Sequence, residues 1–376
     1  MSPKRIVYVI PTLDRSGAEK QLTLLATRLP REEFEPHVIA LTRGGPYAAV
    51  LQAAGVPVTV LGKRWKCDPF ALWKLRWTLT TLRPDIVHTW LFAANAYGRL
   101  ALPGQTSISR IVSERCVDSW KAGWQLWLDR RLIPRTDLLI GNSPSVVDFY
   151  RELGLPTERL RCIPNGVEPP SPSPMNRAAR LKSLGIPEDA YVIGYIGRLA
   201  TQKRVRDLVW AAETLWQIRP QLHLVIIGDG PERERLEDFS AGVHGPGHIH
   251  FLGHRDDAPD WLTAFDVFWL GSSFEGMSNS VMEAMSAGLP VVATDIPANR
   301  ELVIPDETGF LVRLGDPVGF MQFTRRLIDE PGLSTRLGTA GQQRVRAEFS
   351  VERMVSRHLE LYRELTASRP TADVSN

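Results

Sequence analysis

The stretch VFWLGSSFEGMSNSVMEAMSAGLPVVAT, residues 267–294, predicts a strand, a helix and a second strand in immediate succession. Its first four residues form a continuous apolar run. Ser278 or Asn279 can cap the helix that follows, and Gly288 with Pro290 ends it. Two consecutive strands joined through a helix lie parallel in one sheet. The stretch therefore indicates an open, parallel α/β sheet.

The same alternation extends outward from this stretch. In the carboxy-terminal half, further strands are expected in YVIGYIGRL (191–199), LHLVIIGDG (222–230), HIHFLGH (248–254) and GFLVRLG (309–315). In the amino-terminal half, strands are expected in RIVYVIPTL (5–13), EPHVIALT (35–42), VPVTVLG (56–62), PDIVHTW (84–90), SISRIVSER (107–115) and TDLLIGNS (136–143). Strands that alternate with helices at this spacing predict two Rossmann-like, doubly wound parallel-sheet domains that face each other across a cleft.

Proline and serine interrupt the alternation in the middle of the chain, which is typical of a linker. At 376 residues the chain is long enough to form two cores. We expect an amino-terminal domain over residues 1–168, a linker over 169–180 and a carboxy-terminal domain over 181–350, followed by a returning helix over 351–366 and a disordered tail over 367–376.

Charge is divided unevenly between the two halves. Residues 1–170 hold 23 Lys and Arg against 15 Asp and Glu, whereas residues 171–376 hold 22 against 27. The basic half favours an anionic surface or ligand. No signal peptide or membrane-spanning run is predicted, and Cys67, Cys116 and Cys162 lack metal-ligand spacing. We therefore expect a cytoplasmic protein whose cysteines lie in the core.

Ligands of open parallel sheets bind beyond the carboxyl ends of the strands, so residues that follow strands are the candidates for a site. Arg233 occupies the third-glycine position of a dinucleotide fingerprint in GDGPER, which disfavours a nicotinamide cofactor. Arg198 and Lys203 follow the first carboxy-terminal strand and could both reach one diphosphate. Taken alone, such cations are more often solvated surface charges.

Two glutamates flank the helix start in the opening stretch. Glu275 lies on the loop just before the backbone N–H groups of residues 277–280, and Glu283 lies one turn into the helix. An anion at this helix start would place neighbouring hydroxyls beside both carboxylates, which accept hydrogen bonds from a ribose or hexose diol. Either glutamate alone is better explained as a solvated residue, but the combination indicates a sugar joined to a nucleoside diphosphate.

EGMSNSVMEAMSAGLPVVATD (275–295) resembles the E-x7-E motif of the retaining GT-B glycosyltransferases of family GT4. Six further segments are similar to that family and occur in its order: SGAEKQL (16–22), PDIVHTWLFAAN (84–95), PNGVE (164–168), GYIGRLATQKRVRDLVWA (194–211), IIGDGPERERLE (226–237) and FLGHRDDAPDWLTAFDVFWL (251–270). The resemblance covers nearly the whole chain. It implies a GT-B fold.

The resemblance also implies a role for each matching position. Glu275 would contact the hydroxyls of the donor sugar, and Glu283 would bind the ribose diol. Arg198 and Lys203 would neutralise the leaving diphosphate. Five consecutive residues would hold sugar and phosphate: Gly276, Met277, Ser278, Asn279 and Ser280. The backbone near Arg255 would contact the base, and the Gly17 turn would approach the phosphates.

The amino-terminal domain departs from the family pattern in two places. Many relatives have HTHLFHAN where this chain has HTWLFAAN, so that His88 remains while Trp90 and Ala93 replace histidines. Relatives often end the next strand in TEH, whose histidine contacts the donor sugar, whereas this chain has SER, ending in Arg115. Some members that handle lipid-linked sugars share SER. His88 and Arg115 are therefore candidate sugar or acceptor contacts in this domain.

We predict a retaining hexosyltransferase that moves a hexose or N-acetylhexosamine from a nucleotide diphosphate sugar to a lipid-linked or polysaccharide acceptor in cell-surface glycan biosynthesis. The acceptor should bind on residues 1–168. UDP is the more common base in such enzymes, and GDP is the other candidate. The alternatives are a nucleotide-sugar 2-epimerase and a non-catalytic scaffold that binds a sugar nucleotide.

The sequence offers no obvious enzymic nucleophile, which favours a front-face mechanism in which the leaving phosphate helps to deprotonate the acceptor. It also has no D-x-D pattern, so neither a metal nor a cofactor is expected. His248 and His250 share one face of an expected strand, but the family has an ordinary strand at this position.

Trp is interleaved with Lys and Arg at helical spacing in KRWKCDPFALWKLRW and DSWKAGWQLWLDRRL. The residues concerned are Trp73, Trp77, Trp120, Trp124 and Trp127. Such helices suit a membrane interface with anionic lipid, which predicts a peripheral position on the inner leaflet of the plasma membrane. In the alternative interpretation the tryptophans face the core and the cations face water. No fold for nucleic-acid recognition is predicted.

Overall fold

The structure, a computed structural model, describes residues 2–104, 106–117, 121–170, 175–243 and 247–367. The chain divides into two compact units, each treated by itself below. Unit 1 comprises Met1–Gly166 and Val351–Asn376, and unit 2 comprises Val167–Ser350. Trp120 and the part of the expected tail over residues 368–376 lie outside the described residues.

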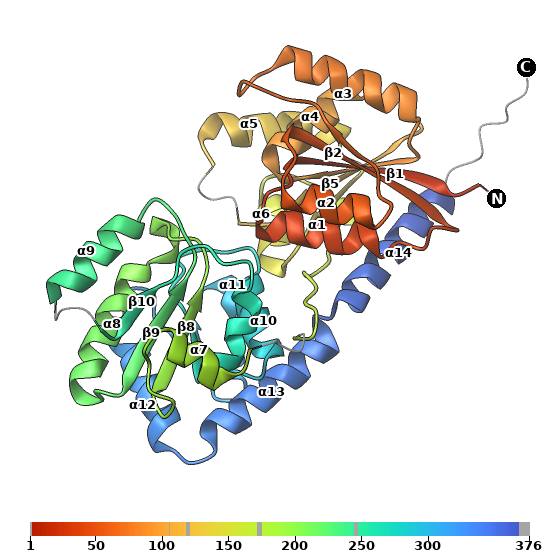
Figure 1. Ribbon diagram of the computed structural model, residues 1–376. Helices are drawn as coiled ribbons and strands as arrows, with labels where there is room; N and C mark the ends of the chain where they lie inside the picture. The colour runs from red at the N-terminus through yellow and green to blue at the C-terminus, as the bar shows by residue number, and fades with distance from the viewer. Residues whose placement is uncertain (1, 105, 118–120, 171–174, 244–246, 368–376) are drawn as a thin grey trace, which may run out of the picture. The chain divides into compact units, whose positions relative to one another are not determined.

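Unit 1 is built on a seven-stranded parallel sheet with strand order β3-β2-β1-β4-β5-β6-β7. Strands β1, β2 and β5 of this sheet are labelled in Figure 1. Its strands are β1 Lys4–Thr12, β2 Phe34–Arg43, β3 Val58–Val60, β4 Ile86–Trp90, β5 Ser109–Glu114, β6 Leu138–Gly141 and β7 Leu160–Cys162. Its helices are α1 Gly17–Thr27, α2 Pro46–Ala53, α3 Pro69–Leu82, α4 Leu91–Ala101, α5 Gly123–Leu132, η1 Ile133–Arg135, α6 Pro144–Glu152, η2 Thr157–Arg159 and α14 Val351–Ala367.

Alternate residues of β1 supply two separate cores. Ile6 and Tyr8 belong to a cluster that includes side chains of α1, α2 and α14. Val7 and Val9 belong to another cluster that includes side chains of α3 and α4. Successive strand residues point to opposite faces of a sheet, so the sheet of unit 1 is covered by helices on both sides.

Unit 2 is built on a six-stranded parallel sheet with strand order β10-β9-β8-β11-β12-β13. Its strands are β8 Tyr191–Ile196, β9 Leu222–Ile227, β10 Ile249–Phe251, β11 Val267–Leu270, β12 Val291–Thr294 and β13 Gly309–Val312. Its helices are α7 Arg177–Ser183, η3 Thr201–Lys203, α8 Val205–Ile218, α9 Arg233–Val243, η4 Ala258–Ala264, α10 Asn279–Ser286, α11 Pro297–Arg300, α12 Pro317–Asp329 and α13 Leu333–Glu348. The prediction of two doubly wound parallel sheets is confirmed.

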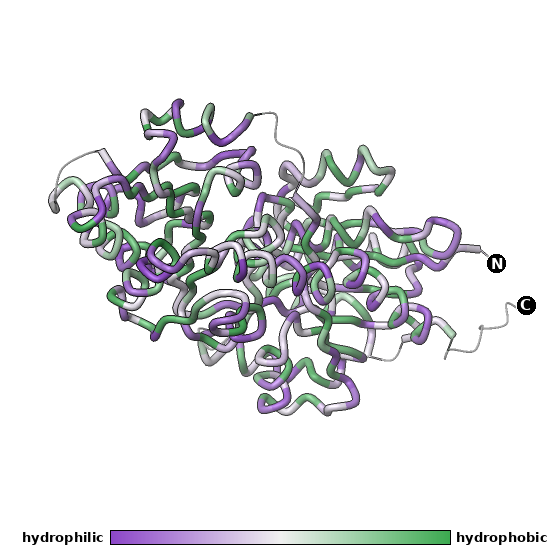
Figure 2. The backbone as a smooth tube through the Cα atoms, turned by 90° about the horizontal axis from the view of Figure 1, so that it is seen from below, coloured by the Kyte–Doolittle hydropathy of each residue, from purple (hydrophilic) through white to green (hydrophobic). Residues whose placement is uncertain are grey.

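The segments from which the two parallel sheets are predicted show a clear pattern of hydrophobic and hydrophilic residues. Strands β9, β11 and β12 of unit 2 are buried throughout, as expected for strands that have helices on both faces, whereas the edge strand β10 is half-buried. The alternation of hydrophobic and hydrophilic residues along the chain can be followed in Figure 2. The continuous apolar runs therefore mark parallel strands correctly.

Three expectations differ from the structure. Residues 177–180, expected in the linker, are helical because the Asn176 side chain caps α7 by accepting a hydrogen bond from the Ala179 N–H. Helix α14 also continues through Ala367, one residue beyond the expected end. The cysteines are not core residues. Cys67 is exposed in the loop before α3, Cys162 is exposed at the end of the edge strand β7, and Cys116 is half-buried.

Buried histidines of unit 1 make its stability sensitive to pH. His88 and His358 are fully buried, with ring centroids 6.0 Å apart. Burial lowers the pKa of His88 well below its ordinary value of 6.5 and that of His358 to about 3. The unfolded chain therefore binds protons more readily than the folded chain, and stability should be lost as the pH falls below about 6.5.

Urea unfolding followed by circular dichroism between pH 7 and pH 4 measures this effect. His358→Asn should flatten part of the slope, whereas His254→Asn should not, because the side chain of His254 is 59% exposed. A free energy of unfolding that is independent of pH over this range would contradict the prediction.

Candidate functional site

Two loops that carry candidate residues lie side by side in unit 2. Strands β8 and β11 are paired, so the loops at their carboxyl ends are neighbours. The Ser273 backbone N–H and Oγ both donate to the Gln202 carbonyl, at 2.8 and 3.0 Å, and Gln202 Nε2 donates to the Phe274 carbonyl at 2.6 Å. These bonds fix the segment that leads to Glu275 against the short helix η3.

Lys203 and Glu275 form an ion pair at this junction. Lys203 Nζ donates a hydrogen bond to Glu275 Oε1, and the two side chains are only 18% and 12% exposed. The residues are 72 positions apart in the sequence. The sequence predicts each of them as a site residue, but the structure adds that they touch.

Arg198 is exposed on the loop after β8, and its side chain has no hydrogen bond or ion pair to any residue that the structure describes. The loop itself is held in two ways. The buried Tyr195 hydroxyl donates to the Arg198 carbonyl at 3.1 Å. Burial, with a smaller contribution from the Glu275 charge, raises the pKa of Tyr195, so that its hydroxyl remains a donor. The Leu199 N–H donates to the Asp229 carbonyl at 2.9 Å.

The two glycines of GDG allow this close approach of loops. A Cβ on Gly228 would lie 1.8 Å from the Gly197 carbonyl oxygen, and a Cβ on Gly230 would lie 2.2 Å from that of Leu199. The glycines therefore pack the loop after β9 against the loop that carries Arg198. This role needs no third glycine and no dinucleotide.

Arg255 lies on the loop after β10, next to the same group of loops. The Gly228 N–H donates to the Gly253 carbonyl at 2.8 Å, which joins the loops after β9 and β10. The Arg255 guanidinium donates twice to Asp257, at 2.7 and 3.1 Å, and this pairing is the main reason why the pKa of Asp257 is lowered to about 2. The side chain of Arg255 is thus already engaged with a carboxylate.

The expected helix start is α10, and Ser278 occupies its N-cap position. The Ser278 side chain does not cap the helix, because its Oγ lies 3.3 Å from the Ser280 Oγ. Gly276, Met277 and Ser278 are buried, whereas Asn279 and Ser280 are half-buried. Glu283 is half-buried one turn further on. Unit 2 therefore gathers Glu275, Lys203 and the start of α10 in one place.

Of the three candidate residues in unit 1, Gly17 is exposed to solvent and His88 is buried. Gly17 is exposed as the first residue of α1, just after β1. His88 is fully buried, and both of its ring nitrogens are engaged, Nδ1 with the Tyr362 hydroxyl and Nε2 with the Ser113 Oγ, each at 2.7 Å. His88 could contact a ligand only by breaking one of these bonds. In the structure it holds Ser113 in place.

Arg115 follows β5 directly and is half-buried. Its guanidinium carbon lies 3.8 Å from the centroid of the Trp90 ring, and its Nη1 donates to Asn165 Oδ1 at 3.0 Å. The sequence does not identify Trp90 and Asn165 as neighbours of Arg115. The available signal was that Trp90 and Arg115 both depart from the family pattern, but their contact is not visible in the sequence.

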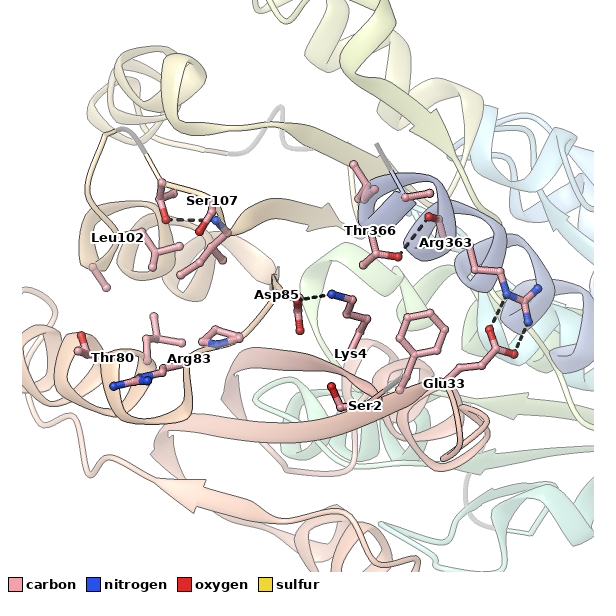
Figure 3. A pocket seen from close by; sticks show the side chains of 18 of the residues that line it. Ser2, Lys4, Glu33, Thr80, Arg83, Asp85, Leu102, Ser107, Arg363 and Thr366 are labelled. Carbon is pink, nitrogen blue, oxygen red and sulfur yellow. Dashed lines mark hydrogen bonds and ion pairs between the residues drawn. The ribbon is translucent and has the colours of Figure 1, made fainter. Parts of the chain in front are cut away.

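A pocket of about 1510 Å³ in unit 1 lies near the amino ends of the strands (Figure 3). Lys4 lies beside Asp85 there, and Arg363 lies beside Glu33. The strands of this sheet are parallel, so this edge is opposite to the one where β5 leads to Arg115. The pocket is lined by none of the candidate residues.

The histidines that could suggest a metal have other partners. His248 Nε2 lies 2.9 Å from Glu213 Oε2, and His250 Nε2 lies 3.1 Å from His223 Nδ1. Within the described ranges, no group of three or more His, Cys, Asp or Glu side chains is arranged to hold a metal ion. The expectation that the protein needs no metal stays a prediction. The helices of the described chain include none with the length and apolar character needed to cross a membrane.

Comparison with known proteins finds glycosyltransferases in both halves of the chain. The family model "Glycosyl transferases group 1" matches residues 176–344, and the model "Glycosyltransferase Family 4" matches residues 15–170. The structure is similar to the crystal structure of Anabaena Alr3699/HepE in complex with UDP-glucose, with a TM-score of 0.86 and 21% identity, over 96% of this chain and 99% of that one. The chain belongs to the glycosyltransferases of GT-B fold that these two models describe.

Two relatives illustrate how much of this chain and of the matching protein such similarities cover. The UDP-Gal:alpha-D-GlcNAc-diphosphoundecaprenol alpha-1,3-galactosyltransferase of Escherichia coli is 28% identical over 380 residues, which are 96% of this chain and 97% of that protein. The lipopolysaccharide core biosynthesis glycosyltransferase LpsE of Rhizobium meliloti is 30% identical over 235 residues, and this match spans 62% of this chain and 65% of that protein.

Proposed function

We propose that this protein is a retaining glycosyltransferase that moves a hexose or N-acetylhexosamine from a UDP-sugar to a lipid-linked or polysaccharide acceptor in cell-surface glycan synthesis. The observation that carries the proposal is the Lys203–Glu275 ion pair beside the start of α10. The E. coli relative is named for a UDP-galactose donor and a lipid-diphosphate acceptor, and the Anabaena structure is named for a UDP-glucose complex. Both names support this choice of substrates.

In the proposed reaction the bond between the anomeric carbon and the diphosphate breaks while a bond to the acceptor oxygen forms on the same face of the sugar. The acceptor's proton passes to an oxygen of the leaving diphosphate. Lys203 and Arg198 neutralise the charge that develops on this diphosphate, and Glu275 contacts the hydroxyls of the donor sugar. Because Glu275 also holds Lys203, one side chain positions both the sugar and the cation. No metal or cofactor is part of this proposal.

Binding of the donor is the first property to test. In a thermal-shift panel of UDP- and GDP-sugars, one UDP-sugar should raise the melting temperature of the wild type, and Glu283→Ala should abolish this shift because the ribose diol loses its acceptor. Glu234→Ala is the matched control, since Glu234 is an exposed glutamate on α9 of the same unit. A shift that survives Glu283→Ala would place the nucleotide elsewhere.

Turnover assays with the same sugar nucleotides, run with and without acceptors, separate the alternative functions. A protein that isomerises the free sugar nucleotide without an acceptor would be a 2-epimerase. A protein that is stabilised by the sugar nucleotide but turns over neither with nor without a set of lipid-diphosphate and oligosaccharide acceptors would be a scaffold. Transfer of sugar to an acceptor supports the proposed function.

Unit 1 also has exposed aromatic side chains on two basic segments, around α3 and on α5, which are together called the basic aromatic surface: Trp65, Phe70, Trp73, Trp77, Trp124 and Trp127. These side chains are between 57% and 69% exposed. The buried face of α3 is instead formed by Ala71, Leu75 and Leu79. The interpretation that these tryptophans face the core is therefore wrong. We propose that this surface, with the cations of the same segments, binds anionic lipid at the inner leaflet.

Liposome flotation tests this proposal. At low salt the wild type should float with vesicles of phosphatidylcholine and phosphatidylglycerol but not with vesicles of phosphatidylcholine alone. The double variant Trp73→Ser, Trp77→Ser should stay at the bottom of the gradient, whereas Trp210→Ser should float. Trp210 is a suitable control because it is 39% exposed on α8 of unit 2. If the wild type does not float with the anionic vesicles, the membrane proposal fails.

A further inference from the structure

Two of the three positions at which unit 1 departs from the family pattern, Trp90 and Arg115, are in direct contact. Trp90 ends β4 and is fully buried, and Arg115 follows β5, the neighbouring strand. The guanidinium carbon of Arg115 lies 3.8 Å from the centroid of the Trp90 ring. A planar guanidinium stacks favourably on an aromatic face, and Trp is the strongest partner for it. Trp90 thus forms a platform that orients Arg115.

The cation of Arg115 has only neutral partners among the described residues. Its Nη1 donates to Asn165 Oδ1 at 3.0 Å and its Nη2 to Ser113 Oγ at 3.5 Å. Its Nε is buried and has no hydrogen-bond partner there. No carboxylate of the described chain lies within ion-pair distance. Burial lowers the pKa of Arg115 to about 9, which leaves the side chain cationic at neutral pH.

Other buried arginines of unit 1 are compensated. Arg99 Nη2 lies 2.6 Å from Asp129 Oδ1, and Arg110 Nη2 lies 3.2 Å from Asp137 Oδ1. Arg110 lies near the amino end of β5, the strand that leads to Arg115. Arg115 is half-buried and, unlike these two arginines, has no described carboxylate within ion-pair distance, although the charge of Glu114 acts on it from further away. An anion bound at its guanidinium would therefore complete this setting.

The position of Arg115 is also suited to a ligand. It lies beyond the carboxyl end of a central strand of a parallel sheet, where ligands of such sheets bind. Ser113, which accepts from Arg115, is held by His88, and His88 is held by Tyr362 of α14. The guanidinium is therefore fixed on two sides, by Trp90 and by this hydrogen-bonded chain.

We propose that Arg115, supported by Trp90, binds a phosphate group of one of the substrates. The fork of N–H groups in a guanidinium matches the oxygens of a phosphate, and the anion supplies the missing counter-charge. The assignment of this phosphate to a substrate rests on the proposed function. Its source is either the diphosphate of the donor or a phosphate of the acceptor.

The test uses the full chain and two titrations followed by calorimetry. The first measures the affinity for UDP, and the second measures the affinity for inorganic pyrophosphate in the presence of saturating UDP. Arg115→Gln should weaken one of the two affinities by about tenfold or more, as expected for hydrogen bonds to a charged group. Arg115→Lys, which keeps the charge but not the fork, should have a smaller effect. Arg110→Gln, which removes a compensated arginine of the same strand, should change neither affinity.

Each outcome distinguishes the sources. A weaker affinity for UDP assigns the phosphate to the donor, and a weaker affinity for pyrophosphate alone assigns it to the acceptor. If Arg115→Gln and Arg115→Lys both bind UDP and pyrophosphate as the wild type does, or if the wild type binds no pyrophosphate and the UDP affinity is unchanged, the proposal is overturned.

Two controls keep this test independent. Circular dichroism shows whether each variant folds, and Trp90→Phe provides a second variant that should weaken the same titration by removing part of the platform. A wild type that binds UDP or pyrophosphate through Arg115 but transfers no sugar would refute the proposed function while leaving the phosphate site in place.

Discussion

Lys203→Ala should lower kcat for sugar transfer by about 10²–10³-fold, the loss expected when one preorganised electrostatic contact to a developing charge is removed. In the structure Lys203 is held by Glu275 and is only 18% exposed. The measurement is steady-state transfer at saturating donor. KM for the donor should change less than kcat, because the charge on the diphosphate develops mainly in the transition state.

Lys182→Ala is the matched control for charge, since Lys182 is an exposed lysine of the same unit on α7. The double variant Lys203→Ala, Glu275→Ala completes a thermodynamic cycle. Its loss should be smaller than the product of the two single losses, because the partners act as one unit. A Lys203→Ala enzyme that retains more than about a tenth of the wild-type kcat would contradict the electrostatic role.

Lys121→Met should lower the free energy of unfolding of unit 1 by about 3–5 kcal/mol, the loss typical of a buried ion pair from which one partner is removed. The Lys121 side chain is 0% exposed. Its Nζ lies 2.9 Å from Asp129 Oδ2 and 3.4 Å from Glu114 Oε1, and it donates to the Tyr150 hydroxyl at 2.8 Å. Without Lys121, two buried carboxylates lose a shared cation.

Urea unfolding followed by circular dichroism measures this loss. Lys4→Met is the matched control, because Lys4 pairs with Asp85 at 3.2 Å but both side chains are more than a third exposed. The control should lose less than about 1 kcal/mol. Equal losses in the two variants would show that the network around Lys121 is no stronger than a surface ion pair.

The fold can be predicted from the sequence because its signal is local. Continuous apolar runs such as the one in β11 are followed by helices at regular spacing, and this pattern needs no knowledge of distant contacts. The first and last residues of the helices and strands are harder to predict from the sequence. The cap of α7 by Asn176 depends on a single side chain within a segment rich in Pro and Ser, which otherwise predicts a linker.

The candidate site is predicted only residue by residue. Glu275 and Lys203 each follow a strand, which the sequence shows, but their contact depends on hydrogen bonds between two loops more than 70 residues apart. The burial of His88 is likewise decided by α14, which supplies Tyr362 from the far end of the chain. Contacts of this kind are set by tertiary packing and leave no periodic signal in the sequence.

The sequence is sufficient to predict that the tryptophans of α3 are exposed to solvent. Ala71, Leu75 and Leu79 form one stripe along α3, and at about 100° per residue Trp73 and Trp77 fall on the opposite side of the helix. Hydrophobicity alone would place these tryptophans in the core, whereas their position relative to the apolar stripe places them in solvent.

Because the side chains of Trp90 and Arg115 are in contact, a substitution at either position changes the surroundings of the other. A change of Arg115 to histidine alone would leave the Trp90 ring without the cation that lies over it. A change of Trp90 to histidine alone would leave Arg115 without its platform and would open space in a fully buried position. Variants designed in this part of unit 1 should therefore exchange the two residues together.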